Sequence, residues 1–348
     1  MRLLILGTGG MARNHAEAFR EINGVILTAC VDTNPDRLTA FADTYAIPNR
    51  FPTLSDALAW GQFDAVANVT PDPVHHPTTL ECLAAGKHVF CEKPLAVNAT
   101  DAFEMTRAQE DAGLIGMVNL TYRNFASIQK ARALIAEGAL GTIRHIEASY
   151  LQSWLTQPAW GHWDREDQWL WRLSTAHGSH GVLGDVGVHI VDFASYGTGL
   201  DIASVMCNLK TFPKAPGDRI GDYVLDANDS CTMQTTFTNG ALGVIHATRW
   251  ASGHVNELKL RAYGEKGGIE VGIRDDETWL KASLGQDMLT GTWAEIACPE
   301  VPTNFQKFAT AVANEQQDEP SFRRAAQVQQ VLDAALKSDE TNTPVRIP

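Results

Sequence analysis

The sequence predicts an α/β protein with two domains: a doubly wound parallel sheet at the N-terminus, and a C-terminal α/β domain with a large, mostly antiparallel open sheet. Its 348 residues exceed the roughly 250–300 residues at which one core usually stops growing. Short apolar runs alternate with segments of helical periodicity in the first part of the chain, and longer alternating strands with tight turns follow. We place the domains at 1–121 and 122–348, with the C-terminal helices able to pack back on the first domain.

The first domain should consist of parallel strands joined by helices on both faces of the sheet, because strands and helices alternate along the chain. The expected strands are Leu3–Leu6, Ile26–Val31, Ala65–Val69, His88–Cys91 and Ile115–Val118. The expected helices are Met11–Arg20, Asp36–Thr44, Thr53–Trp60, Pro77–Ala85 and Thr100–Ala112.

The second domain contains a strong hairpin signal. Asn239-Gly240 lies between the alternating runs Cys231–Phe237 and Leu242–Arg249, and Asn-Gly favours a tight hairpin turn. A second pair of strands is expected at Glu257–Tyr263 and Gly268–Gly272. The spacing of apolar residues predicts helices over Asn304–Asn314 and Arg323–Leu336.

The composition, 44% apolar and 20% charged, is that of an ordinary soluble protein. A net charge of −13 argues against nucleic acid or an anionic membrane as partner, because both need clustered lysine and arginine. No apolar run approaches the roughly 20 residues of a membrane span, and the start reaches glycine too early for a secretory signal, so we expect a cytoplasmic protein. The six cysteines form no CxxC pair, and we expect them to be buried and not catalytic.

The first strand runs directly into Gly7-Thr8-Gly9-Gly10-Met11-Ala12, which fits the pattern G-x-G-x-x-A. Gly7 would permit a tight turn, Gly9 would let the backbone approach a pyrophosphate, and Ala12 would allow close packing of helix on strand. The N-terminus of the next helix would add amide donors and a positive dipole. Because a strand precedes the turn and a helix follows it, we favour a dinucleotide-binding Rossmann turn over a structural turn without a ligand.

The end of the second strand indicates which dinucleotide binds. Asp32 lies 20 residues beyond Ala12, where a carboxylate accepts hydrogen bonds from the ribose hydroxyls of NAD and repels the 2′-phosphate of NADP. Thr33 follows Asp32 in the same loop. Arg37 argues the other way, because its guanidinium could reach a 2′-phosphate. NAD is the expected cofactor, and NADP is the alternative.

Polar residues follow three strand ends of the predicted sheet and should share the crevice that holds the nicotinamide. They lie in three segments: Thr70-Pro71 with His75, Glu92-Lys93, and Asn119 with Tyr122 and Arg123. A lysine beside a cationic nicotinamide and partly out of water gives up its proton more readily, which suits acid–base catalysis. The alternative is a structural Glu92–Lys93 pair, but neighbouring strand residues point to opposite faces.

A second group of chemically active residues lies in segment 181–193. Asp185, His189 and Asp192 stand at i, i+4 and i+7, so a helix ending near Tyr196-Gly197 would carry them on one face. An aspartate one turn from a histidine can fix its tautomer and strengthen it as a base. Three glycines in the segment lower its helix propensity, which indicates that another group approaches closely. A purely structural Asp–His pair is the alternative.

These motifs together resemble the glucose–fructose oxidoreductase/inositol dehydrogenase/MocA family of dehydrogenases. The resemblance rests on G-x-G-x-x-A with Asp32, Thr70-Pro71 with His75, Glu92-Lys93-Pro94 and Asp185-x-Gly187-x-His189, in this order along nearly the whole chain. It implies that Lys93, Asp185 and His189 act together at a substrate hydroxyl, that the Lys93–Pro94 bond can be cis, and that the open sheet makes oligomer contacts in a homodimer or homotetramer. The family often has asparagine in place of Asp72, so we assign Asp72 no cofactor role.

The residues expected to bind the cofactor are Gly7, Thr8, Gly9, Gly10, Met11, Ala12, Asp32, Thr33, Arg37, Thr70, Pro71, His75, Glu92, Lys93 and Asn119. The residues expected to bind the substrate are Lys93, Tyr122, Arg123, Gln152, Trp171, Arg172, Asp185 and His189.

Five of the nine tryptophans lie between Trp154 and Trp171, among charged residues. An indole face packs well on the C–H face of a sugar, so this cluster is typical of a sugar or polyol pocket; the alternative is packing in a core or a subunit interface. His162, His177 and His180 do not have the spacing of a partnered ligand set, so no metal is expected.

The sequence therefore predicts an NAD-dependent dehydrogenase that oxidises a secondary hydroxyl of a sugar, polyol or derivative. Lys93 and His189 would manage the hydroxyl proton, and Asp185 would orient His189. Two alternatives with the same fold remain: a glycosidase that oxidises its substrate transiently with bound NAD, and a non-catalytic regulator that senses dinucleotide.

Overall fold

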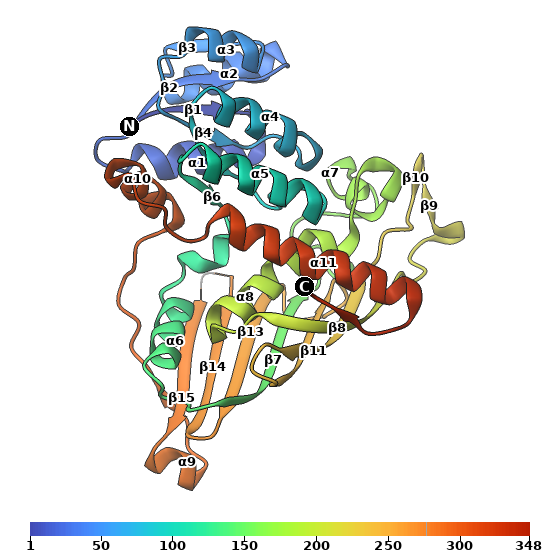
Figure 1. Ribbon diagram of the computed structural model, residues 1–348. Coiled ribbons are helices and arrows are strands. Elements are labelled where there is room, and N and C mark those ends of the chain that lie inside the picture. Colours follow the sequence, from blue (N-terminus) through green and yellow to red (C-terminus); the bar gives the residue numbers. More distant parts are fainter. Residues whose placement is uncertain (276) are drawn as a thin grey trace. The chain divides into compact units, whose positions relative to one another are not determined.

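A computed structural model describes residues 1–275 and 277–348 (Figure 1). The chain divides into two compact units. The first contains residues 1–121 and 302–330, and the second contains residues 122–301 and 331–348.

The first unit contains a six-stranded parallel sheet with strand order β3-β2-β1-β4-β5-β6. Its strands are β1 (Arg2–Leu6), β2 (Ile26–Val31), β3 (Asn49–Phe51), β4 (Ala65–Asn68), β5 (His88–Cys91) and β6 (Gly116–Val118). The strand order reverses between β1 and β4, which is where ligands bind in doubly wound sheets. The predicted fold of the N-terminal domain is confirmed. The short strand β3 was not expected from the sequence.

Helices connect these strands: α1 (Gly10–Arg20), α2 (Pro35–Tyr45), α3 (Leu54–Trp60), α4 (Asp72–Ala84) and α5 (Ala99–Asp111). Side chains of Asn34, Thr53 and Asn98 cap three of them by accepting a hydrogen bond from a backbone amide of the first turn. Helix α4 starts five residues before the expected Pro77, because Asp72 favours the first turn and Pro77 removes only one hydrogen bond inside the helix.

The core of the first unit is completed by α10 (Asn304–Asn314), which begins with a capping box between Thr303 and Gln306. Phe305 of α10 lies 5.1 Å from the Phe19 ring, and Phe308 lies 5.3 Å from the Phe90 ring, between ring centroids. These contacts explain why α10 belongs to the first unit.

The second unit contains a nine-stranded sheet with order β16-β15-β14-β13-β7-β12-β11-β8-β17. Its strands are β7 (Ile143–Gln152), β8 (Ile202–Lys210), β11 (Ser230–Phe237), β12 (Leu242–Thr248), β13 (Asn256–Gly264), β14 (Gly267–Arg274), β15 (Glu277–Leu284), β16 (Ala294–Glu295) and β17 (Val345–Arg346). Among the described strands, β7 and β12 form its one parallel pair. The predicted open, mostly antiparallel sheet is confirmed, and so is the hairpin at Asn239-Gly240 that joins β11 to β12.

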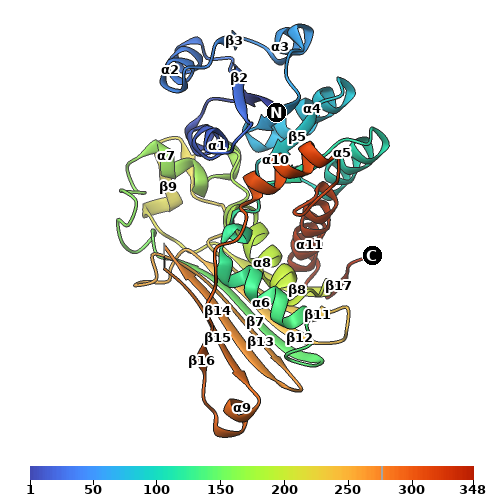
Figure 2. The ribbon, with the colours of Figure 1, turned by 90° about the vertical axis from the view of Figure 1, so that its left-hand side faces the viewer.

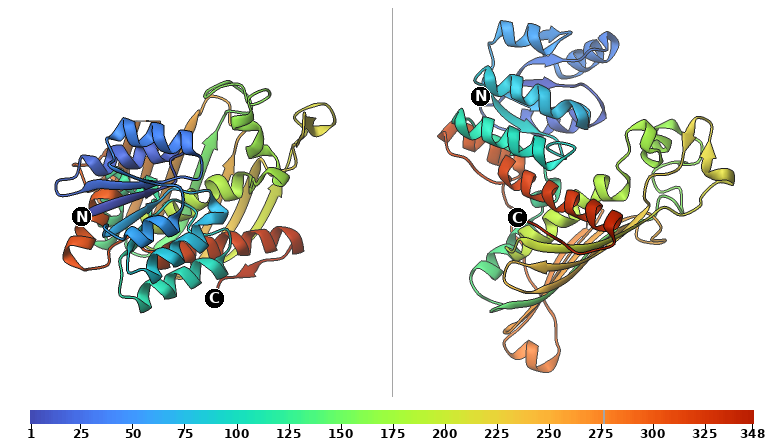
Figure 3. Two further views of the ribbon diagram at one scale, coloured as in Figure 1. Left: turned by 90° about the horizontal axis from the view of Figure 1, so that it is seen from above. Right: turned by 45° about the vertical axis from the view of Figure 1, so that its right-hand side comes forward.

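Helices α6 (Ala126–Ala136) and α8 (Val188–Thr198) pack on one face of this sheet (Figure 2). A short hairpin of β9 (Arg219–Ile220) and β10 (Tyr223–Val224) forms a separate two-stranded sheet. At one end of the nine-stranded sheet, the connection from β15 to β16 carries α9 (Gln286–Thr290), seen in orange in Figure 3. The remaining helical elements are η1 (Thr121–Asn124), α7 (Asp167–Leu170), η2 (Trp171–Leu173), η3 (Thr175–His177), η4 (Leu183–Gly187), η5 (Pro216–Asp218) and α11 (Phe322–Thr341). No helix in residues 1–275 or 277–348 is both long enough and apolar enough to cross a membrane.

The expected helix that carries Asp185, His189 and Asp192 forms as one helical run over residues 181–198, but its geometry differs from the expectation in one respect. Residues Leu183–Gly187 form the π-helix η4, whose wider turns change the angular spacing between Asp185 and His189. Helix α8 ends at Thr198, close to the expected stop near Tyr196-Gly197, and Gly199 with a φ of 72° is its C-cap. Gly197 serves packing, because a Cβ at this position would lie 2.4 Å from Leu260 Cδ2 and 2.6 Å from Ile128 Cδ1.

Candidate active site

The glycine turn between β1 and α1 has the geometry of an open cradle. Gly7 has a φ of 90°, and a Cβ there would lie 2.7 Å from the carbonyl oxygen of Val69, so only glycine fits. At Gly9 and Gly10 a Cβ would meet nothing within 4 Å. Ala12 is fully buried between helix and sheet. The residues present therefore fit a dinucleotide, because the side-chain positions of Gly9 and Gly10 at the start of α1 are open.

Asp32 ties the end of β2 to this turn. Its Oδ2 accepts hydrogen bonds from the backbone N (2.9 Å) and the hydroxyl (2.7 Å) of Thr8. Its Oδ1 accepts from the backbone N of Asn34 (2.7 Å) and from Arg37 Nη2 (3.0 Å). Burial alone would raise the pKa of Asp32, but these hydrogen bonds lower it to about 2. The carboxylate is thus ionised, and its most exposed partner is the Arg37 side chain, at 58% exposure.

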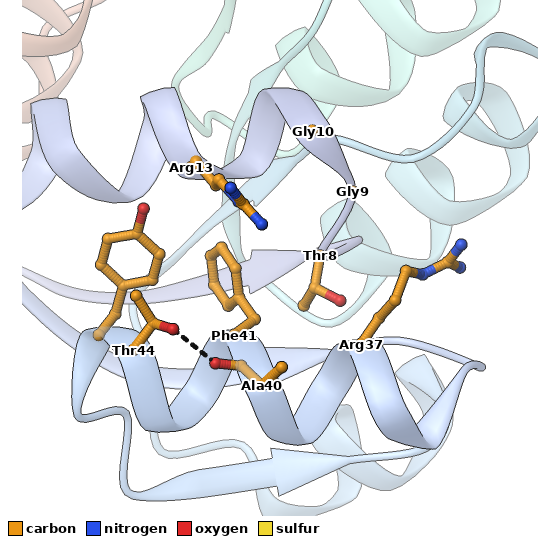
Figure 4. Close-up of a pocket in the computed structure, with 9 residues that line it drawn as sticks. Thr8, Gly9, Gly10, Arg13, Arg37, Ala40, Phe41 and Thr44 are labelled. Carbon is orange, nitrogen blue, oxygen red and sulfur yellow. Dashed lines mark hydrogen bonds between the residues drawn. The ribbon is translucent and has the colours of Figure 1, made fainter. Parts of the chain in front are cut away.

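A cavity of 210 Å³ lies beside the glycine turn, between α1 and α2 (Figure 4). Arg13 of α1 and Arg37 of α2 line it together with Thr8, and the floor includes Phe41. Met11 and Thr33, both expected to contact the cofactor, are exposed near this region.

Glu92, at the end of β5, is the centre of a buried hydrogen-bond network. Its Oε1 accepts from His15 Nε2 and from Asn119 Nδ2, both at 2.7 Å. Its Oε2 accepts from the backbone N of Lys93 at 3.0 Å. Burial would raise the pKa of Glu92, but the hydrogen bond and charge of His15, with Asn119 and Lys93, lower it to about 2. Glu92 therefore links α1 to the ends of β5 and β6, directly before Lys93 in the chain.

The strand ends beside Lys93 are joined in a similar way. The Lys93–Pro94 peptide bond is cis, as the resemblance implied. His75 is fully buried, and its two ring nitrogens lie 2.8 Å from the carbonyl oxygens of Pro94 and Thr70. The Thr70 hydroxyl donates to Asn68 Oδ1 at 2.7 Å, and Pro71 is exposed. His75 thus connects the turns that follow β4 and β5.

In the second unit, Asp185 is held by two arginines. Its Oδ1 accepts from Arg172 Nη1 at 3.0 Å, and its Oδ2 accepts from Arg249 Nη2 at 3.1 Å. Arg249 is fully buried, stacks on the Trp154 ring, and also donates to the carbonyl oxygen of Arg172. Burial lowers the pKa of Arg249, and the Asp185 charge opposes that effect. Sequence reasoning missed Arg249, although its position at the end of an expected strand was a signal.

Aromatic rings surround His189, which is only 9% exposed. The Tyr122 ring stands edge-on to it at 5.0 Å between centroids, and the Tyr150 ring lies at 6.3 Å. The two tyrosine hydroxyls are 2.5 Å apart, and Asn256 Nδ2 donates to the Tyr122 oxygen at 3.3 Å. Burial raises the pKa of both tyrosines. Tyr122 was expected from the sequence, and Tyr150 was not, because it looks like any inward-facing strand residue.

Arg123 and Asp192 form a buried ion pair. Arg123 Nε donates to Asp192 Oδ2 at 2.9 Å, and Arg123 Nη2 donates to Oδ1 at 2.5 Å. Both side chains are less than 5% exposed, and the guanidinium lies over the Tyr196 ring. Arg123 was expected to contact substrate, but in this structure its guanidinium binds a side chain of its own unit.

The tryptophan cluster divides into a buried and an exposed part. Trp154 is 3% exposed and belongs to a small core with Leu155, Leu170, Leu173 and Leu225. Its indole N–H donates to Gln152 Oε1, so the expected substrate contact Gln152 is itself buried. Trp160 and Trp171 are 37% and 38% exposed. The Arg172 guanidinium stacks on the Trp171 ring.

The three histidines that raised the question of a metal do not gather. His177 Nδ1 lies 2.9 Å from Ser174 Oγ, and the His177 ring packs on Tyr223. Across residues 1–275 and 277–348, one group could hold an ion: His76, Asp101 and Glu104. In this group His76 already pairs with Glu104 at 3.1 Å, and Asp101 accepts a hydrogen bond from Asn98.

A doubly wound sheet with an open glycine turn and an ionised Asp32, followed by a second unit built on an open sheet, defines an NAD-binding oxidoreductase. The family "Oxidoreductase family, NAD-binding Rossmann fold" matches residues 1–120, and "GFO/IDH/MocA C-terminal domain" matches residues 128–270. The chain belongs to the GFO/IDH/MocA family of oxidoreductases, as the motifs indicated.

Known proteins are similar along most of the chain. Levoglucosan dehydrogenase of Pseudarthrobacter phenanthrenivorans is 27% identical over 76% of this chain and 72% of its own, and myo-inositol 2-dehydrogenase of Thermotoga maritima is 25% identical over 77% and 74%. The crystal structure of an oxidoreductase domain protein from Kribbella flavida has a TM-score of 0.87 and 29% identity, covering 99% of this chain and 98% of that one. A levoglucosan dehydrogenase in complex with NADH and levoglucosan has the same fold, with a TM-score of 0.87 and 23% identity, covering 100% and 99%.

Proposed function

We propose that this protein oxidises a secondary hydroxyl of a sugar, polyol or close derivative with NAD. The observation that carries the proposal is the position of Lys93, at the carboxyl end of β5 in an NAD-binding unit, with its backbone N–H held by buried Glu92. The similarity to levoglucosan, myo-inositol and D-apiose dehydrogenases supports the substrate class.

The residues of the first unit would hold the cofactor. The amides at Gly9 and Gly10 would bind the pyrophosphate, because a helix N-terminus offers free N–H donors and these glycines leave their side-chain positions open. The Asp32 carboxylate suits the adenosine ribose once its most exposed partner, the Arg37 guanidinium, moves aside. Bound NAD would supply the hydride acceptor.

Lys93 and His189 would carry the proton chemistry. As the carbon–hydrogen bond breaks and hydride leaves, the hydroxyl proton passes to one of these side chains, so that a carbonyl forms. Asp185 would orient His189 and strengthen it as a base. Arg172 and Arg249 hold both Asp185 oxygens, so this carboxylate is itself fixed in place. Lys93 belongs to the first unit and Asp185 and His189 to the second.

The open face of the nine-stranded sheet would support a homodimer or homotetramer. Leu242 and Val244 of β12 are 61% and 42% exposed, while Gly243 and Ile245 point to the buried face. Sedimentation equilibrium tests this expectation, and a monomer would contradict it.

A substrate panel tests the proposed reaction. Levoglucosan, myo-inositol, D-apiose and glucose 6-phosphate are each incubated with NAD and, in parallel, with NADP, and NADH absorbance is followed. Nitrophenyl glycosides are added to the panel, because a glycosidase with transient oxidation would release nitrophenol without net NADH. Net NADH formation from a free sugar or polyol is the expected result. Release of nitrophenol alone would overturn the proposal.

A further inference from the structure

A chain of hydrogen bonds in the second unit has a fixed direction from end to end. It starts at the Trp154 indole, whose Nε1–H can only donate and lies 3.1 Å from Gln152 Oε1. Gln152 therefore turns its amide NH2 toward Asn256, where Nε2 donates to Oδ1 at 3.2 Å. Asn256 in turn points its own Nδ2 at the Tyr122 oxygen, 3.3 Å away. The Tyr122 hydroxyl thus accepts a hydrogen bond from Asn256.

The second partner of Tyr122 is the Tyr150 hydroxyl, at 2.5 Å between the two oxygens. Tyr150 is only 4% exposed, so its hydrogen needs an acceptor within the protein. Burial raises the pKa of Tyr150, and the hydrogen bond with Gln152 opposes this rise, which means that Gln152 acts as a donor. Within the part of the chain that the structure describes, the Tyr122 oxygen is then the acceptor for the Tyr150 hydrogen.

These two donors determine what the Tyr122 hydroxyl can do. A hydroxyl oxygen accepts two hydrogen bonds through its lone pairs and donates one. Both acceptor positions of Tyr122 are filled, by Asn256 and Tyr150, so its own hydrogen points to a third partner. Burial raises the pKa of Tyr122, and the charge of Asp185 adds to this rise, so the hydroxyl keeps its hydrogen at neutral pH. Toward the third partner, Tyr122 can act only as a donor.

The position of Tyr122 indicates which partner this is. Its ring stands edge-on to His189, at 5.0 Å between centroids, and Tyr122 is less buried than Tyr150. We propose that Tyr122 is a further catalytic residue, whose hydroxyl donates a hydrogen bond to the substrate oxygen that His189 serves. Gln152, Asn256 and Tyr150 are positioning residues that act through it.

The donor acts on the charge that develops during oxidation. The substrate hydroxyl gives its proton to Lys93 or His189 and the carbon gives hydride to NAD, so negative charge builds up on the oxygen before the carbonyl forms. A hydrogen bond from Tyr122 stabilises that charge, and Tyr122 keeps its own proton throughout. The sequence suggested a direct substrate contact for Gln152; its burial favours a role that acts through Tyr122 instead.

Tyr122→Phe tests the donor, because it keeps the ring and removes the hydroxyl. The kinetic tests rest on the proposed function and use the best substrate of the panel. In Tyr122→Phe, kcat should fall about 100-fold, as it does when one donor to a developing charge is removed. KM should change less than about threefold, since the hydrogen bond strengthens in the transition state. Tyr263→Phe on β13, outside the hydrogen-bond chain, is the matched control and should turn over normally. Normal kcat in Tyr122→Phe would overturn the catalytic role.

Gln152→Glu tests the direction of the chain. A carboxylate can only accept, so Asn256 would turn its NH2 toward position 152 and its oxygen toward Tyr122. Tyr122 would then donate to Asn256 and not to the substrate, and kcat should fall about as far as in Tyr122→Phe. The double variant should be no slower than Tyr122→Phe alone, because both changes remove the same hydrogen bond. Losses that multiply in the double variant would overturn the positioning role of Gln152.

The hydrogen positions are tested on the unaltered protein, without any substrate. Neutron diffraction from crystals exchanged into heavy water locates the deuterium on each hydroxyl. The Tyr150 deuterium should lie between the two tyrosine oxygens, and the Tyr122 deuterium should point away from both Tyr150 and Asn256. Because this measurement needs no turnover, it separates failure of this inference from failure of the proposed reaction. A Tyr122 deuterium lying between the two tyrosine oxygens would overturn the inference.

Discussion

Replacing Glu92 by Gln should destabilise the first unit strongly, because the buried carboxylate is the acceptor for three donors. The gap between the ordinary glutamate pKa of 4.5 and the folded value of about 2 corresponds to about 3 kcal/mol of stability. Glutamine keeps the size of the side chain but turns an amide toward donors, either at the Lys93 backbone N–H or at His15 and Asn119.

The effect should depend on pH with a defined sign. Because folding lowers the pKa of Glu92, the stabilisation is complete above about pH 4.5 and is lost as the pH falls toward about 2. Amide hydrogen exchange of β5 and β6 measures it locally. At neutral pH, exchange in Glu92→Gln should be about 100-fold faster than in the unaltered protein. The exposed Glu81→Gln on α4 is the control and should differ by less than about twofold. Equal exchange rates in Glu92→Gln and the unaltered protein, or a difference that does not shrink toward pH 2, would refute this reasoning.

Three further predictions concern other parts of the molecule. Gly197→Ala should lower the free energy of unfolding by about 1–3 kcal/mol and lower Tm, because the new Cβ would overlap side chains of the sheet and α6. Gly10→Ala is the control and should leave Tm unchanged, because a Cβ at Gly10 meets open space. Equal Tm values for the two variants would count against close packing at Gly197. Arg249→Met should destabilise the second unit by about 3 kcal/mol and reduce kcat, because Asp185 loses its buried partner; an unchanged denaturation midpoint would contradict this. Asp32→Ala should shift the ratio of kcat/KM with NADP to kcat/KM with NAD toward NADP by at least about tenfold, because a negative charge beside the 2′-phosphate is removed. Adding Arg37→Ala should reverse part of this gain. An unchanged ratio in Asp32→Ala would argue against Asp32 as the residue that selects the cofactor.

Local sequence signals predicted the elements whose structure depends on local chemistry. The glycine turn, the end of β2 and the Asn239-Gly240 hairpin follow from backbone requirements within a few residues. The π-helix η4 could not be predicted in this way, because its geometry depends on packing around glycines. Helix propensity identifies these glycines only as weak helix formers. The spacing of apolar residues located α10 correctly. It could not predict that the apolar face of α10 packs on the core of the first unit.

The candidate site shows the same division. The types of residue at the strand ends identified the crevice, but the partners of those residues are distant in sequence. Arg249 binds Asp185 across 64 positions, and His15 binds Glu92 across 77. Arg123 looked like a substrate ligand because it follows a strand end, and only the three-dimensional structure shows its buried ion pair with Asp192.

NADH formation by Lys93→Ala, with saturating NAD and the best substrate of the panel, tests the proposed catalytic role of Lys93 most directly. NAD affinity should stay within about threefold of the unaltered protein, and turnover should fall by a factor on the order of 10² to 10⁴. Lys337→Ala, on the exposed side of α11, is the matched control and should turn over normally. Near-normal NADH formation by Lys93→Ala would contradict a catalytic role for Lys93.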